Sequence, residues 1–155
     1  MIQELDHINI VVSNLEEARA FFLNFGFIEH DAAELTGDWI SSIVGLEGVR
    51  ARYVALHLPG STTNLELIEY QSPPSSRDPA TGRANQIGFR HLAFAVDNIE
   101  EEVARLRQAG IAFLSEVQTF ARTGKKLVYL YGPDAILLEL AEYPARPAAG
   151  QAGQG

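Results

Sequence analysis

The stretch RHLAFAVDNIEEEV, Arg90 to Val103, repeats a pattern that already occurs in DHINIVVSNLEEAR, Asp6 to Arg19. Each stretch holds a charged residue, a His, an alternating apolar run, a polar pair and a Glu-rich segment, and His7 and His91 take the same place. Because this pattern occurs twice, we expect the chain to fold as two similar modules. The rest of the sequence can then be divided between these two modules.

Each copy predicts a strand followed by a helix. The run His7 to Val12 is β-branched and apolar, as in a largely buried strand. Ser13 or Asn14 then offers an N-cap, with a Glu three residues later completing a capping box, and the second copy has the same arrangement. Gly26 and Gly110 stand where a helix end needs a positive φ. The apolar residues at helical spacing are Leu15, Ala18, Phe22 and Phe25 in the first copy and Ile99, Val103 and Leu106 in the second.

Further strands complete each copy. After the Gly we expect one strand and then a hairpin with a turn rich in Gly and Pro. Each half is then β-α-β-β-β, and we predict an α+β fold of two tandem βαβββ modules. The expected strands are 27–29, 51–58 and 64–70 in the first half, and 111–114, 126–131 and 136–143 in the second.

The first half also carries an insertion, AAELTGDWISSIVGLEGV, within residues 30–50. Trp39, Ile40, Ile43, Val44 and Leu46 predict a short amphipathic helix there. Such a helix is either a lid or a packing element, and packing is the simpler interpretation.

We predict one domain over residues 1–143, with module one at 1–70, a linker at 71–89 and module two at 90–143. The linker is rich in Pro, Ser and Gly. Residues 144–155 have almost nothing to bury, and we expect a mobile tail there.

Composition narrows the class of protein. A chain of 155 residues buries one substantial core, and no apolar run approaches the ~20 residues that span a bilayer. The N-terminus has no secretory pattern and the chain has no cysteine, so we expect a cytoplasmic protein. The net charge of −8 disfavours nucleic acid and anionic membranes as partners and favours a small-molecule substrate.

Two Leu-Glu-Leu strands give the repeat its chemistry. Glu66 lies in NLELIEY at the end of the first half, and Glu139 lies in ILLELAEY at the end of the second. A carboxylate inside an apolar strand costs several kcal/mol to desolvate unless it is paired or bound to a metal. Each half thus offers one His and one Glu, and together His7, Glu66, His91 and Glu139 suit one divalent transition metal: Zn, Ni, Co, Mn or Fe.

Any one of these residues, taken alone, is more often a surface group or a hydrogen-bonded core residue. The repetition of both the His and the Leu-Glu-Leu in two halves favours the metal interpretation. His30 and His57 have no counterpart in the second half and are interpreted as ordinary residues, while the paired Glu69 and Glu142 are expected to be solvated. Candidates to hold a substrate carboxylate or phosphate are Arg50, Arg52, Arg83, Arg90, Lys125 and Lys126.

From about Leu5 to Tyr143 the chain resembles the vicinal oxygen chelate superfamily, which includes glyoxalases, methylmalonyl-CoA epimerases, extradiol dioxygenases and bleomycin and fosfomycin resistance proteins. The resemblance is carried by DHINIVVSNLEEARAFF, NLELIEY, RHLAFAVDNIEEEVARLRQAGI and GPDAILLELAEYP. It implies that the sheets of two βαβββ modules curl into a partly open barrel around a metal held by His7, Glu66, His91 and Glu139. The openings of the modules are most similar to the epimerase branch, whereas the ligand set is similar to bacterial glyoxalase I.

The resemblance also implies an activity. We expect a metal-dependent lyase, isomerase or epimerase that chelates vicinal oxygens of a small carbonyl, hydroxy-acid or thioester substrate. A proton would move through an enediolate, with Glu139 or Glu66 as the base. The alternatives are an extradiol-type dioxygenase and a non-catalytic, drug-sequestering binding protein of the same fold. Members of the superfamily form dimers, so we expect a homodimer.

Overall fold

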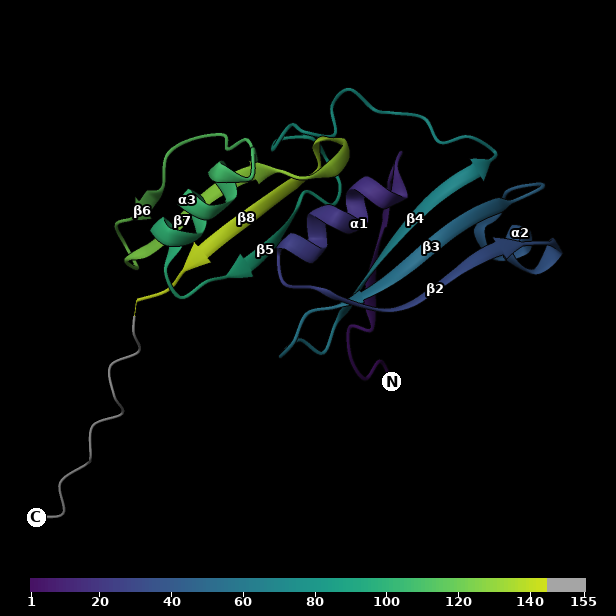
Figure 1. Ribbon diagram of the computed structural model, residues 1–155, viewed down its shortest axis with the longest axis horizontal. Coiled ribbons are helices and arrows are strands. Elements are labelled where there is room, and N and C mark those ends of the chain that lie inside the picture. The colour runs from purple at the N-terminus through teal and green to yellow at the C-terminus, as the bar shows by residue number, and fades with distance from the viewer. Residues whose placement is uncertain (145–155) are drawn as a thin grey trace, which may run out of the picture. The chain divides into compact units, whose positions relative to one another are not determined.

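The computed structural model describes residues 1–144, and the chain divides into two compact units, residues 1–79 and the residues from 80 onward. The first unit is a four-stranded sheet with two helices (Figure 1). Its strands lie in the order β1-β4-β3-β2, with β1 parallel to β4 and the other pairs antiparallel. Its elements are β1 His7–Val11, α1 Leu15–Asn24, β2 Ile28–Thr36, α2 Asp38–Val44, β3 Arg50–His57 and β4 Asn64–Ser72.

The second unit repeats this topology with the order β5-β8-β7-β6, again with one parallel pair, β5 and β8. Its elements are β5 His91–Ala95, α3 Ile99–Gln108, β6 Gln118–Phe120, β7 Lys125–Tyr131, a 3-10 turn at Pro133–Ala135 and β8 Leu137–Glu142. The predicted α+β class and the two βαβββ modules are confirmed. Within the described residues each sheet pairs only its own strands, so the sheets are not closed into a barrel.

The strand-to-helix junctions form as the local sequence predicts. The side chain of Asn14 accepts a hydrogen bond from the backbone N–H of Glu17 at 3.1 Å, and Asn98 accepts one from Glu101 at 3.2 Å. These contacts satisfy N–H groups that have no partner inside the helix. Beyond the helix ends, Gly26 and Gly110 take positive φ values of 88° and 82°, which a side chain would disfavour.

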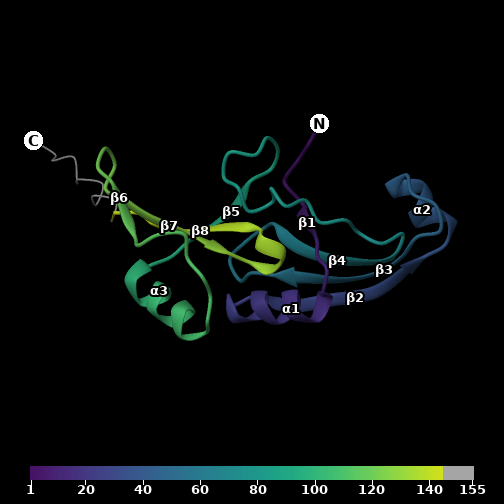
Figure 2. The ribbon, with the colours of Figure 1, turned by 90° about the horizontal axis from the view of Figure 1, so that it is seen from above.

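One helix of each module covers one face of its sheet, α1 in the first and α3 in the second (Figure 2). From α1, Ala18 and Phe22 are fully buried, and Leu67 of β4 is among the buried residues of the sheet. In α3, Ile99 and Leu106 are fully buried. Because residues alternate along a strand, the residues between these core positions point to the opposite face of each sheet.

Two predicted strands were wrong, one in its length and one in its position. β2 continues to Thr36, because residues 31–36, which were expected to belong to the insertion, pair with residues 50–55 of β3. In module two no strand forms at 111–114, where only Phe113 makes an isolated bridge to Leu130, and the edge strand is β6 at 118–120. β6 has only three residues, all exposed, so it carries no apolar pattern that would have indicated a strand.

The insertion forms the predicted helix α2, with one face packed on the first sheet. Ile40 is 6% exposed and clusters with Val49, Ala51 and Ile68. Trp39 and Ile43 on the other face are 58% and 72% exposed. Since Ile68 shares a strand face with Glu66, α2 covers one end of the sheet face that carries the predicted ligands.

No helix of residues 1–144 is long and apolar enough to cross a membrane. The predicted tail, apart from Pro144, lies outside the described residues.

Candidate metal centre

In the first module, the parallel pairing of β1 and β4 brings His7 and Glu66 together. Asn9 lies opposite Glu66 in the register. His7, two residues before Asn9, is therefore the diagonal neighbour of Glu66 on the same sheet face. The His7 Nε2 atom lies 3.5 Å from Glu66 Oε2, and the amide of Asn9 donates to the same oxygen at 3.4 Å. This His and Glu point away from α1, as strand alternation predicts.

Asp6 orients the His7 ring. Its carboxylate lies 2.7 Å from Nδ1 and accepts a hydrogen bond from it, which leaves Nε2 on the side of Glu66. The hydrogen bond to Asp6 raises the pKa of His7 above 6.5, and the charge of Glu66 adds to this effect while partial burial opposes it. A carboxylate behind a ring nitrogen is the arrangement that commonly supports a metal-binding His.

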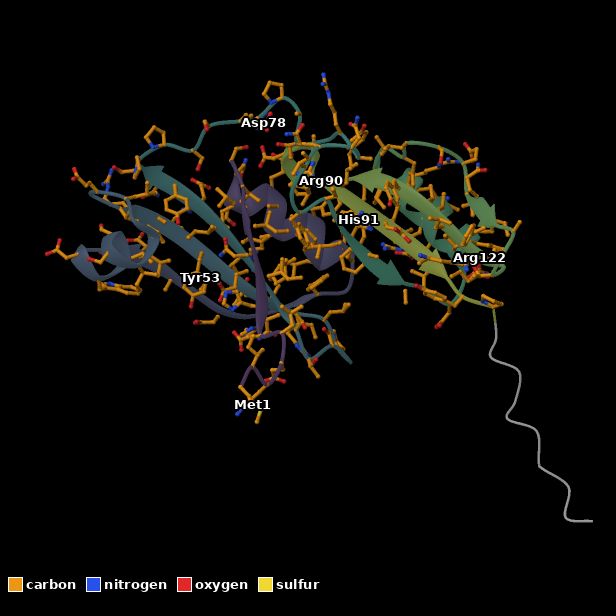
Figure 3. All side chains as sticks on the ribbon, turned by 180° about the vertical axis from the view of Figure 1, so that it is seen from behind. Met1, Tyr53, Asp78, Arg90, His91 and Arg122 are labelled. Atoms are coloured by element: carbon orange, nitrogen blue, oxygen red, sulfur yellow. The ribbon has the colours of Figure 1, made fainter. Side chains whose placement is uncertain are left out.

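In the second module, β5 and β8 bring His91 and Glu139 together in the same way. Ala93 lies opposite Glu139, and His91 Nε2 is 3.2 Å from Glu139 Oε2. The side chain of Glu139 is 5% exposed, against 29% for Glu66. Glu139 is the one charged residue among the buried residues of the described chain. His91 can be located on β5 in Figure 3.

Lys125 and Tyr129 of β7 complete the surroundings of Glu139. The Lys125 ammonium donates to Glu139 Oε1 at 2.7 Å, and this hydrogen bond raises the pKa of Lys125 above 10.5. Tyr129 lies opposite Glu139 in the register, and its ring centre is 4.9 Å from that of His91. Burial, followed by the negative charge of Glu139, raises the pKa of the Tyr129 hydroxyl. The Glu139 carboxylate therefore interacts with three side chains, those of His91, Lys125 and Tyr129.

Within each pair, the distance between the imidazole nitrogen and the carboxylate oxygen is compatible with both atoms binding the same cation. Two atoms that each bind a first-row metal at about 2.1 Å lie roughly 3.0–3.4 Å apart for coordination angles between octahedral and tetrahedral. The two separations between Nε2 and the carboxylate oxygen, 3.5 and 3.2 Å, are close to this range. Neutral imidazole and carboxylate also form a donor set suited to Zn, Mn, Fe, Co or Ni.

In residues 1–144 no group of three or more His, Cys, Asp or Glu side chains is gathered closely enough to hold a metal ion. The structure thus places two predicted ligands together in each module, His7 with Glu66 and His91 with Glu139.

The first sheet carries a further polar pair that sequence reasoning missed. Tyr53 of β3, labelled in Figure 3, donates a hydrogen bond to Asp31 of β2. This bond to Asp31 raises the pKa of Tyr53, with burial as a second cause. Tyr53 alternates to the same sheet face as Glu66, since Ala55 lies opposite Glu66. Asp31 lies beyond residues 27–29, where the second strand was predicted, so the sequence pattern did not indicate that Asp31 would face Tyr53 from a neighbouring strand.

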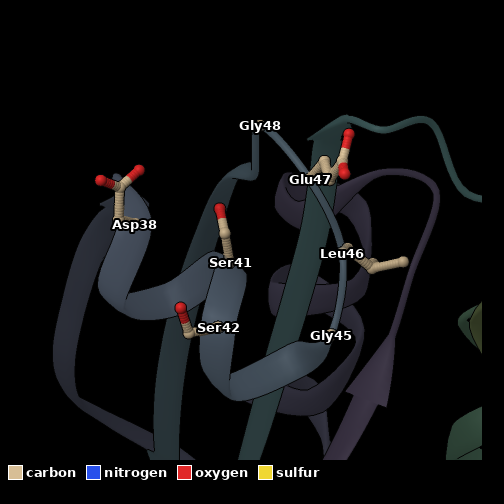
Figure 4. Close-up of a pocket in the computed structure, with 7 residues that line it drawn as sticks. All are labelled: Asp38, Ser41, Ser42, Gly45, Leu46, Glu47 and Gly48. Carbon is tan, nitrogen blue, oxygen red and sulfur yellow. The ribbon is translucent and has the colours of Figure 1, made fainter.

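A surface pocket over α2 lies apart from the predicted ligands. Asp38, Ser41, Ser42, Gly45, Leu46, Glu47 and Gly48 line it (Figure 4). None of the four predicted ligands lines this pocket.

Two Glu residues predicted to be solvated are instead partly buried. Glu69 accepts a hydrogen bond from the backbone N–H of Leu15, and Glu142 accepts one from Ile99, each at 2.8 Å. Both lie on the helix side of their sheets, so they support the fold and not the candidate metal centre.

Comparison with known proteins agrees with this fold and these motifs. The model of the Glyoxalase/Bleomycin resistance protein/Dioxygenase superfamily matches residues 4–140. The chain belongs to this superfamily, and the matched residues include all four predicted ligands.

Among its relatives are epimerases of two kinds. The human mitochondrial methylmalonyl-CoA epimerase is 32% identical over 146 residues, which cover 89% of this chain and 73% of that protein. The 2-epi-5-epi-valiolone epimerase of Actinomyces sp is 30% identical over 150 residues, covering 90% of this chain and 79% of that protein. These names indicate related reactions on different substrates.

Solved structures confirm the fold. A glyoxalase family protein from Bacillus cereus superposes with a TM-score of 0.85 at 29% identity, covering 92% of this chain and 95% of that one. The fosfomycin resistance protein FosX from Listeria monocytogenes, in complex with Mn(II), gives a TM-score of 0.60 at 20% identity, covering 94% and 96%.

Proposed function

We propose that this protein is a divalent-metal-dependent epimerase, isomerase or lyase that moves a proton next to a carbonyl group of a small substrate. The observation that carries the proposal is the duplicated His–Glu pair. In each module one imidazole nitrogen and one carboxylate oxygen face each other from adjacent parallel strands, 3.5 Å apart in one and 3.2 Å in the other.

The metal ligands in this proposal are His7, Glu66, His91 and Glu139, the one His and one Glu that each module places together. FosX supports the general idea, since that protein holds Mn(II) within the same fold. A bound divalent cation would acidify a C–H beside two chelated oxygens and stabilise the negative charge that develops there.

We assign the base role to Glu66. Glu139 is tied by a charge-assisted hydrogen bond to Lys125 and is 5% exposed, which favours a fixed ligand. Glu66 is 29% exposed and contacts the uncharged Asn9 amide and the His7 ring. A carboxylate with weaker partners has the greater freedom to accept a proton from a nearby carbon and to return it. Glu139 then acts mainly by holding the cation.

Two relatives favour epimerisation within this reaction class, because both are named for it while their substrates differ. The substrate is a small molecule in this proposal. The homodimer and the cytoplasmic location inferred from the sequence remain predictions.

The first test is the metal content of the protein purified without added metal, measured by elemental analysis. We expect one divalent transition metal per site in the wild type and a loss of bound metal in the His7→Ala/His91→Ala variant. A His30→Ala/His57→Ala variant serves as the matched control and should keep its metal. A wild-type protein that contains no metal and takes none up would contradict the four-ligand site.

The second test is proton exchange. In D₂O, the loaded protein should incorporate deuterium at the acidic C–H of a substrate, followed by NMR, with methylmalonyl-CoA and 2-epi-5-epi-valiolone as the first compounds. Exchange that persists unchanged in Glu66→Gln would exclude Glu66 as the base.

A further inference from the structure

The two oxygens of the Glu139 carboxylate contact partners of different kinds. Lys125 Nζ donates a hydrogen bond to Oε1 at 2.7 Å, whereas His91 Nε2 lies 3.2 Å from Oε2. An ammonium group can only donate, while an imidazole nitrogen without a proton can bind a metal ion. Oε1 therefore faces a permanent donor, and Oε2 faces the atom with which it would share a cation.

The corresponding glutamate of module one is arranged differently. Oε2 of Glu66 lies 3.5 Å from His7 Nε2 and also accepts the hydrogen bond from the Asn9 amide. Among the hydrogen bonds and ion pairs described for residues 1–144, none involves Oε1 of Glu66. Both contacts of Glu66 thus lie on one oxygen, and no cation contacts the other.

The shared topology of the two modules does not require a cation beside the glutamate. Counting along β3 and β7 from the residues opposite the two glutamates equates Lys125 with Ala51. Ala51 is 1% exposed, packs in the cluster under α2 and carries no charge. Lys125 is 22% exposed, and its Nζ also lies 5.3 Å from the ring centre of Tyr143. Lys125 is thus a feature of module two alone.

Charge compensation explains why a cation lies near a buried carboxylate, but not which oxygen the cation contacts. An ammonium at either oxygen of Glu139 would neutralise its charge. In the structure Lys125 contacts Oε1 and leaves clear the oxygen beside His91, the residue with which Glu139 is proposed to bind the metal. The position of Lys125 therefore has a consequence for metal binding as well as for stability.

A carboxylate binds a metal ion through one oxygen or through both. If both oxygens of Glu139 bound the cation, Oε1 would contact the cation and the Lys125 ammonium together, and these positive charges repel each other. A cation between His91 Nε2 and Oε2 leaves the hydrogen bond from Lys125 intact. Binding through Oε2 alone is thus favoured, and Glu139 then takes up a single coordination position.

We propose that Lys125 is a positioning residue that makes Glu139 a one-oxygen ligand, because it holds Oε1 and leaves only Oε2 to bind the divalent cation. The inference rests on the proposed function and deepens it by describing how module two presents its carboxylate to the metal. Lys125 therefore does not bind the substrate, although the sequence made it a candidate. The coordination position that Oε1 leaves open is available to water or to a substrate oxygen.

The test uses the Mn²⁺-loaded full chain of the wild type, Lys125→Met, Lys125→Arg and Lys126→Met. Lys126 is the matched control because it follows Lys125 directly and pairs with Glu142 on the helix side of the sheet. Crystal structures of the loaded proteins give the distance from Mn²⁺ to each oxygen of Glu139. Magnetic relaxation of the solvent water gives the number of water molecules bound to Mn²⁺, a quantity that does not depend on activity.

In the wild type we expect Oε2 alone to bind Mn²⁺, with Lys125 still donating to Oε1. In Lys125→Met the released Oε1 should bind Mn²⁺ as well and displace a bound water molecule. Lys125→Arg keeps a cationic donor at Oε1 and should preserve the wild-type ligation and water number, as should Lys126→Met. A residue that only stabilised the fold would change the unfolding free energy and leave the ligation of Mn²⁺ as it is.

If the wild type binds no Mn²⁺, the proposed function and this inference both fail. If the wild type binds Mn²⁺ through Oε1 or through both oxygens of Glu139, the inference alone is overturned. The same conclusion follows if Lys125→Met keeps the wild-type ligation and water number. The wild-type structure tests the inference even where Lys125→Met does not fold, because Oε1 must still contact Lys125 beside the bound cation.

Discussion

Glu69 and Glu142 occupy the same place in the two modules, each accepting a hydrogen bond from the first backbone N–H of its module's helix at 2.8 Å. Each also pairs with a cation on the preceding strand, Arg52 at 3.1 Å and Lys126 at 3.6 Å. A carboxylate at a helix N-terminus satisfies an unpaired N–H group and interacts favourably with the helix dipole.

Replacement of either carboxylate should therefore lower stability and leave the metal site intact. We expect Glu69→Ala and Glu142→Ala each to lose about 1.5–3 kcal/mol of unfolding free energy, the usual range for a hydrogen bond to a charged group. Urea unfolding of the metal-free protein measures this. Glu4→Ala, at an exposed position, is the control and should change little. A loss of bound metal at unchanged stability would point to a functional role for these residues.

Glu66→Gln and Glu139→Gln should differ in stability although they make the same chemical change. Glu139→Gln leaves the Lys125 ammonium without its counter-ion, so we expect a cost of about 1–3 kcal/mol in the metal-free protein. Glu66 has no Lys or Arg partner among its described contacts, and Glu66→Gln should cost less. Denaturant titration compares the two. Equal stabilities would show that the pairing with Lys125 contributes nothing.

His7 should titrate above the ordinary histidine value of 6.5 in the metal-free protein, since Asp6 accepts its Nδ1 hydrogen bond. A raised pKa means that the protonated ring stabilises the fold. This contribution is complete below the unfolded-state pKa and is lost as pH rises through the folded-state pKa.

Asp6→Asn should move the His7 midpoint down toward 6.5, as followed by NMR of the ring protons. It should also flatten the dependence of stability on pH in that window. Asp38→Asn, an exposed change on α2, is the control. A midpoint that stays in place in Asp6→Asn would rule out Asp6 as the cause.

Ile40 and Ile43 offer a matched pair on α2. Ile40 is 6% exposed within the cluster of Val49, Ala51 and Ile68, whereas Ile43 is 72% exposed. We expect Ile40→Ala to cost about 2–4 kcal/mol by leaving a cavity, and Ile43→Ala to cost less than about 0.5 kcal/mol. Thermal or urea unfolding measures both. Similar small losses would mean that α2 is not packed as described.

Local signals account for the predictions that succeeded. Asn14 and Asn98 form caps with backbone groups three residues away, and Gly26 and Gly110 need only their own φ angles. Strand alternation is also local: it puts His7 and Asn9 on one face of β1, and Glu66 and Ile68 on one face of β4.

The failures have two causes. The edge strand β6 forms at 118–120 and not at 111–114, and its three exposed residues carry no apolar pattern that would indicate a strand. The second cause is a partner far away in the sequence. Glu69 and Glu142 were expected to be solvated because nothing near them in sequence shows a helix N-terminus 54 and 43 residues away.

By itself, the sequence determined the repeated strand, cap and helix, since these depend on spacing within a few residues. It also led to the prediction that His7, Glu66, His91 and Glu139 bind a metal. Only the tertiary structure decided that Glu139 is buried with Lys125 while Glu66 is partly exposed beside Asn9. The physical reason is that burial and charge pairing are set by side chains from different strands, and these depend on register, which no short stretch of sequence contains.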